Sequence, residues 1–198
     1  MRTDWTAGFV QVAPGFDAAH CPDPVPAGYE WCMVYAGGTS ATHAWEQAEL
    51  ALVRHLPRLP VWVPTPGSDD PVNAAQLFVA WLKAHNVPPV RGGEHTRVMW
   101  DMETGREPDP EWLKKAASVL ALAGYFNLVY GSIDTLFGQP ARSGYVVANP
   151  TNVLHMYPKA GVVATQYQFD VRTPGDPGGV IDKDVAVLEL VEQMWQPS

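Results

Sequence analysis

The sequence is poor in cysteine and has no long hydrophobic run. Its 198 residues hold only Cys21 and Cys32, too few for a disulfide framework, and we expect free thiols rather than a bridge. The longest apolar run, residues 116–126, is interrupted by Ser118 and Gly124 and is far shorter than the ~20 residues of a membrane-spanning helix. The opening residues also lack the pattern of a secretory signal. These absences predict a soluble protein without membrane insertion, which would need another route of export.

Positive charge is scarce as well. The 13 Lys and Arg residues stand against 21 Asp and Glu residues, a net charge of −8. An acidic surface of that size repels polyphosphates, so nucleic acid is not an expected partner. The six histidines show no H-E-x-x-H spacing, and Cys21 and Cys32 lie too far apart for a zinc knuckle. We therefore expect no metal site and no cofactor.

No Gly/Ser linker, charge run or internal repeat divides the chain, so we expect a single domain over residues 1–198. Its apolar content of 46% can supply a sizeable core. Short apolar runs alternate with segments of helical period, which is typical of a largely parallel sheet wrapped by helices. We expect strands near residues 9–12, 29–35, 59–63, 97–100, 127–131, 145–148, 162–167 and 180–184.

The spacing of apolar residues predicts helices over residues 42–56 and 185–195. Asp70-Pro71 and Asp109-Pro110 each look like a helix start with an N-cap and a proline in the first turn. The pattern suits a compact (β/α) barrel, complete or trimmed, with an open doubly wound sheet as the main alternative. No phosphate-binding glycine fingerprint follows the first strand, which favours the barrel.

Acidic residues mark three strand exits, where the loops of such a barrel converge. Asp17 leaves the first strand, and Asp182 with Asp184 lies at the start or end of the last. Asp101 and Glu103 leave the fourth strand two residues apart, which puts both on one face with backbone positions roughly 6 to 7 Å apart. Such a pair can divide its roles, one carboxyl staying protonated and the other charged. Glycosidic bond cleavage needs that combination, although a lone Asp-x-Glu is more often a solvated turn and Glu103 could pair with Arg106.

Aromatic residues near the strand exits could stack on a sugar ring. These are Trp100, Tyr130, Tyr167 and Tyr35. The other tryptophans that fall on apolar periodicity are expected in the core. Ser132 lacks the second glycine of a nucleophile elbow, so an open-sheet esterase that uses it is the weakest of the enzyme alternatives.

Several short motifs occur in order along the chain: Gly15-Phe16-Asp17, Trp100-Asp101-Met102-Glu103, Tyr130-Gly131-Ser132, Gln166-Tyr167 and Val180-Ile181-Asp182. This ordered set resembles the glycoside hydrolase family 25 lysozymes, the Chalaropsis-type N-acetylmuramidases often found as phage endolysins. Residues 44–48 are similar, too, to a related glycoside-hydrolase-like domain of actinobacterial and phage proteins.

This resemblance implies an incomplete eight-stranded barrel that hydrolyses the β-1,4 bond between N-acetylmuramic acid and N-acetylglucosamine with retention. Glu103 would be the general acid, and Asp101 would steady the substrate's N-acetyl group or the developing cation. Asp17 and Asp182 would complete an acidic groove lined by Tyr167 and Tyr130, with Asp184 as the alternative to Asp182. The implied partner is peptidoglycan or a related glycan, met outside the cell, at the wall or as part of a phage particle.

The sequence departs from the family after Asp17, where it reads Ala18-Ala19-His20-Cys21-Pro22 in place of a Ser-His-x-Gln type continuation. The Pro- and Gly-rich stretch 170–179 is a second departure. Both leave room for an inactive barrel that serves as a virion or cell-wall glycan-binding module with an assembly partner.

Overall fold

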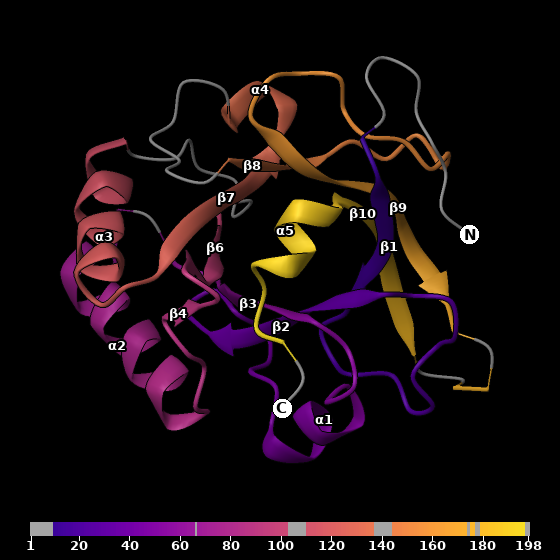
Figure 1. Ribbon diagram of the computed structural model, residues 1–198, viewed down its shortest axis with the longest axis horizontal. Helices are drawn as coiled ribbons and strands as arrows, with labels where there is room; N and C mark the ends of the chain where they lie inside the picture. The colour runs from indigo at the N-terminus through magenta and orange to yellow at the C-terminus, as the bar shows by residue number, and fades with distance from the viewer. Residues whose placement is uncertain are drawn as a thin grey trace.

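Eight strands close into a barrel in the computed structural model, which describes residues 10–65, 67–102, 110–136, 144–173, 175–176 and 179–196. The order around the barrel is β1-β10-β9-β8-β7-β6-β3-β2 (Figure 1). These strands are β1 (Val12–Asp17), β2 (Trp31–Gly37), β3 (Arg58–Trp62), β6 (Arg97–Asp101), β7 (Phe126–Ser132), β8 (Tyr145–Ala148), β9 (Val162–Arg172) and β10 (Val180–Val187). The expected barrel is therefore confirmed over the open sheet. A small hairpin, β4 (Val90–Arg91) and β5 (Glu94–His95), stands apart from it.

Within the described residues, helices cover only part of the barrel, which agrees with a trimmed (β/α) barrel. α2 (Pro71–Ala84) and α3 (Pro110–Leu122) lie side by side along one flank (Figure 1). Asp70 caps α2 as the sequence predicted, accepting a hydrogen bond from the Asn73 amide at 2.7 Å. The other helices are short: α1 (Gln47–Leu52), α4 (Ile133–Leu136) and α5 (Leu188–Glu192). In the part of the chain that the structure describes, no helix is long and apolar enough to cross a membrane.

Strand direction decides which residues meet at each end of the barrel. The neighbours from β1 through β2, β3, β6, β7 and β8 to β9 are parallel, whereas β10 is antiparallel to both β9 and β1. The start of β10 therefore lies beside the ends of the parallel strands. Asp182 is opposite Asp17, and Asp184 is opposite Gly15 and Gln166.

The barrel interior is filled at one end and polar at the other. Large apolar side chains occupy the filled end, and five of them are at most 1% exposed: Trp31, Met33, Leu59, Met99 and Leu128. Gly15 is needed for this packing, because a Cβ there would lie 2.1 Å from the Trp31 ring. The Trp31 indole donates to the Ala13 carbonyl at 3.1 Å.

α5 closes the filled end of the barrel. Because β10 runs in reverse, it ends beside the start of β1, where Val187 pairs with Val12. α5 follows at once and appears in the middle of the ring of strands in Figure 1. Its Leu190 and the following Met194 are buried in the interior cluster. The ends of the parallel strands face the opposite way.

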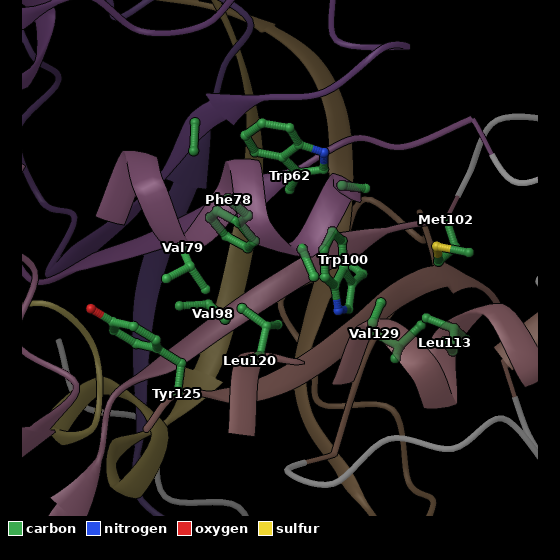
Figure 2. Packing of buried hydrophobic residues seen from close by; sticks show 14 of the residues in the cluster. Trp62, Phe78, Val79, Val98, Trp100, Met102, Leu113, Leu120, Tyr125 and Val129 are labelled. Carbon is green, nitrogen blue, oxygen red and sulfur yellow. The ribbon is translucent and has the colours of Figure 1, made fainter. Parts of the chain in front are cut away.

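A second core lies between the barrel wall and α2 and α3 (Figure 2). The Trp100 ring contacts Phe78 with centroids 5.4 Å apart and Trp112 at 5.3 Å, both edge to face. Such aromatic packing adds to the apolar area buried there.

Two helices are shorter than the sequence predicted. Residues 42–56 give only the six-residue α1, which begins after Glu46, whose amide donates to the Glu49 carboxylate at 2.8 Å. The closing helix begins at Leu188 rather than at Val185, because Val185 and Ala186 pair with both β1 and β9. Backbone pairing at barrel closure outweighs the helical periodicity there. Cys21 and Cys32 are free, as expected.

Candidate active site

Asp17 and Asp182 meet at the open end of the barrel, joined by the side-chain amide of Gln166. The Gln166 Nε2 donates to Asp17 Oδ2 at 2.7 Å and to Asp182 Oδ2 at 3.1 Å. The Asp170 amide donates to the other oxygen of Asp182 at 2.7 Å. Two acids 165 positions apart (182 − 17) thus share one hydrogen-bond donor, as their opposed places on β1 and β10 require.

Two tyrosines extend this network. The Tyr35 hydroxyl donates to Asp17 Oδ1 at 3.3 Å, and the Tyr130 hydroxyl donates to Gln166 Oε1. Burial and the charge of Asp17 raise the pKa of Tyr35 well above its usual value, so its hydroxyl keeps its proton at neutral pH. Tyr35 and Tyr130 thus lie beside the acids and contact the network through their hydroxyls, with Tyr130 buried. Their expected contact with a sugar ring stays a prediction.

Asp101 ends β6 at the same mouth, next to Tyr130 on β7. It is partly exposed and faces a pocket of about 190 Å³. The charge of Asp101 is one of the causes that raise the pKa of Asp17, which places the two groups within electrostatic range. The pocket is lined by Ala19, Tyr35, Ser40, Ala41, Thr42, Val63 and Asp101.

The acids at the mouth hold protons unequally. Burial, followed by the charge of Asp182, raises the pKa of Asp17 to about 7 against the hydrogen bond from Gln166. Burial also raises the pKa of Asp182, which the Asp170 amide opposes. Asp184 lies deeper and is fully buried, beside the carboxyl group of Asp17. Burial and the charges of Asp17 and Asp182 raise its pKa well above normal. Asp17, Asp182 and Asp184 together therefore keep at least one proton near neutral pH.

Glu103, the expected general acid, and Arg106 lie outside the described residues. The role of Glu103 stays a prediction.

Two of the four aromatic residues expected at the groove are elsewhere. Trp100 is 0% exposed and points into the core under α2 and α3, because neighbours along a strand face opposite sides and Asp101 faces inward. Tyr167 follows the inward Gln166 and for the same reason points outward, where it packs on Val12 and Val185. We correct both expectations: neither ring is placed to stack on a sugar in the barrel mouth.

Comparisons with known structures give the same architecture. The chain superposes on an uncharacterized B. stearothermophilus protein with a TM-score of 0.69, at 14% identity over 92% of this chain and 100% of that one. It is similar to the modular autolysin LytC of Streptococcus pneumoniae, solved with a synthetic peptidoglycan ligand (TM-score 0.65, 17% identity, 88% of this chain and 46% of that one). A family 25 glycosyl hydrolase from Bacillus anthracis matches with a TM-score of 0.59, at 14% identity over 88% of both chains.

The chain has the fold of family 25 glycosyl hydrolases. The fold that the sequence resemblance implied is thus confirmed. No protein-family model and no curated protein sequence matches the chain.

Within this family 25 fold, sequence reasoning gave no role to Gln166 and left Asp184 as an alternative. Both could have been found from the two-residue period of their strands. Ala164 and Ala186 are small, buried residues of the interior, and stepping by two from each leads to Gln166 and to Asp184. What the period does not show is that β10 runs in reverse and brings these side chains to the mouth.

Proposed function

We propose that this protein is a lysozyme-like glycosidase that cleaves the β-1,4 bond of peptidoglycan at the open end of the barrel. The supporting observation is the convergence of Asp17, Asp182 and Asp101 at one mouth, where burial and mutual repulsion give the acids unequal proton affinities. A site that cleaves a glycosidic bond needs both a proton donor and an anion. The similarity of fold to a peptidoglycan-binding autolysin is consistent with this substrate.

In the proposed reaction, Glu103 donates its proton to the glycosidic oxygen as the bond to the anomeric carbon breaks. Asp101 faces the pocket and stabilises the N-acetyl group or the positive charge that develops on the sugar. Water then adds to the anomeric carbon, and the Glu103 carboxylate takes up its proton, which restores the starting state.

Asp17 and Asp182 have a supporting role in this proposal. With a pKa of about 7, Asp17 is partly protonated at neutral pH. Because it is buried, it acts through Tyr35 and Gln166, whose side chains it binds. Gln166 fixes its orientation by holding Asp17 and Asp182 together. Tyr35 closes the side of the pocket next to Asp17.

The test is release of reducing ends and muropeptides from purified peptidoglycan by wild type, Glu103→Gln and Asp101→Asn. We expect Glu103→Gln to lose about 10²- to 10⁴-fold in rate, the usual contribution of a general acid, and Asp101→Asn to be impaired as well. Glu192→Gln is the matched control, because Glu192 is exposed on α5 at the closed end. Full activity of Glu103→Gln would exclude the assigned acid.

The same assay separates catalysis from simple binding. A glycan-binding or virion module would retain peptidoglycan in a pull-down and release no product from any variant. The phage setting and the assembly partner stay predictions from the sequence.

A further inference from the structure

Two histidines and a glutamate converge beside the barrel mouth, outside the network of aspartates. His20 lies in the loop after β1, His43 in the segment before α1, and Glu49 within α1. His43 Nε2 is 2.6 Å from Glu49 Oε2, and His20 Nδ1 is 3.9 Å from Glu49 Oε1. The two imidazole rings are stacked with centroids 4.1 Å apart. One ligand atom from each of the three residues lies within 4.8 Å of the others.

The Glu49 carboxylate is held in place by the backbone. The Cys21 amide donates to its Oε1 at 2.9 Å, and the Glu46 amide donates to its Oε2 at 2.8 Å. A carboxylate whose orientation is fixed by two backbone amides thus lies beside two imidazole rings, and its side chain is only 17% exposed.

The spacing suits a small divalent ion. Bonds of about 2.0 to 2.2 Å in a tetrahedral site put ligand atoms roughly 3.3 Å apart. His43 Nε2 is closer than this to one oxygen of Glu49, His20 Nδ1 is farther from the other, and one ligand atom from each residue lies within 4.8 Å of the others. An ion pair between His43 and Glu49 would account for the shorter distance. It does not account for His20, which is stacked on His43 with its own nitrogen turned toward the same carboxylate although its side chain is 73% exposed.

We propose that His20, His43 and Glu49 form a binding site for a Zn²⁺-like transition-metal ion, with the fourth position open to water on the exposed side of His20. Two imidazoles and one carboxylate favour Zn²⁺, Co²⁺ or Ni²⁺ over the oxygen-seeking Mg²⁺ and Ca²⁺. The sequence did not predict this site because its ligands come from three separate segments rather than from one spaced motif.

The ion would join two walls of the pocket that Asp101 faces. Ala19 is adjacent to His20, Thr42 is adjacent to His43, and both line that pocket. Metal binding would therefore fix the loop after β1 against the segment before α1 at the rim. This role is structural and does not depend on the proposed glycosidase activity.

The test is isothermal titration of tag-free protein with ZnCl₂, and the expected result is one ion per chain. His20→Ala and His43→Ala should each weaken binding by ~10-fold or more, the scale seen when even the supporting groups of a metal site are lost. His55→Ala is the matched control, because His55 is an exposed histidine just after α1 and outside the cluster; it should bind as wild type does, and MgCl₂ should give no binding.

Co²⁺ absorption provides a second readout. Co²⁺-loaded wild type should show visible bands of a low-coordinate site, which His20→Ala should lose. The exposed His20 can be replaced with less risk to the fold than His43, whose bond to Glu49 is partly buried. Absence of Zn²⁺ binding to wild type, or equal binding by wild type and His20→Ala, would overturn the proposal.

Discussion

At the residue scale, the folded structure disfavours the ionised form of Asp17. Burial and Asp182 raise the pKa of Asp17 from 3.8 to about 7. Between those values the folded chain keeps a proton that the unfolded chain releases. The free energy of unfolding therefore falls as pH rises from about 4 to about 7, at ~1.4 kcal/mol per pH unit for this group, and is level above 7.

We expect Asp17→Asn to remove this dependence. At pH 8 the free energy of unfolding of the variant should exceed that of wild type by ~1–4 kcal/mol. The difference should be smaller at pH 4, where wild-type Asp17 is protonated. Chemical denaturation at both pH values is the measurement. Asp134→Asn, at an exposed position of α4, should change stability by less than about 0.5 kcal/mol at either pH. An equal gain at both pH values would mean that the charge of Asp17 is not the cause.

Gly15 gives a second prediction at this scale. A methyl group there would lie within 2.1 Å of the Trp31 ring, so Gly15→Ala should cost ~3 kcal/mol or more in unfolding free energy through overpacking. Trp31→Leu in the same chain should restore part of the loss, because the clash partner is gone. If the double variant is less stable than Gly15→Ala alone, the steric explanation fails.

The residues that sequence reasoning placed correctly and those it misplaced follow one rule. Strand period two put Asp101 on the inner face, and the same period sends Trp100 into the outer core. Tyr167 was chosen for its nearness to a strand end, but its parity is opposite to that of Gln166. The face of a strand on which each side chain lies can be read from a sequence by counting in steps of two. The hydrogen-bond partners of Asp17 cannot, because they depend on how the barrel closes.

At the scale of elements, α5 covers one end of the barrel and leaves the end with the acids open. Its Leu190 is 3% exposed within the interior cluster, so Leu190→Ala should destabilise the fold by ~2–4 kcal/mol through the cavity it leaves. Because α5 lies at the end opposite the acids, hydrolysis per folded molecule should stay unchanged below the melting transition. Thermal unfolding combined with the muropeptide assay checks both parts. A large loss of specific activity at temperatures where the variant is folded would argue against the separation of the two ends.

The elements themselves were largely predictable where local signals agree. Asp70-Pro71 gave the start of α2 correctly because cap, proline and apolar face all coincide. The closing helix was expected to begin too early, because its first residues are apolar and fit the spacing of a helix as well as that of a strand. In the structure these residues pair with the neighbouring strands. The sequence did not decide whether the sheet closes into a barrel, since parallel strands of this kind also form open sheets.

At the scale of the whole molecule, the net charge of −8 bears on encounters with a charged wall. Peptidoglycan that carries anionic polymers should repel the protein at low ionic strength. Raising the salt from about 0.01 M to 0.15 M shortens the screening length from about 30 Å to about 8 Å. We therefore expect faster lysis of intact walls as salt rises over this range, with a smaller change on short, uncharged glycan fragments. A fall in wall lysis over the same range would contradict this view.

The reversed β10 has a practical consequence for anyone handling the protein. Since that strand carries the chain away from the acids and through α5, a dye, affinity handle or solid support joined after Gln196 would be held at the far pole of the molecule. A substrate as bulky as an insoluble wall fragment could then approach the immobilised protein without obstruction.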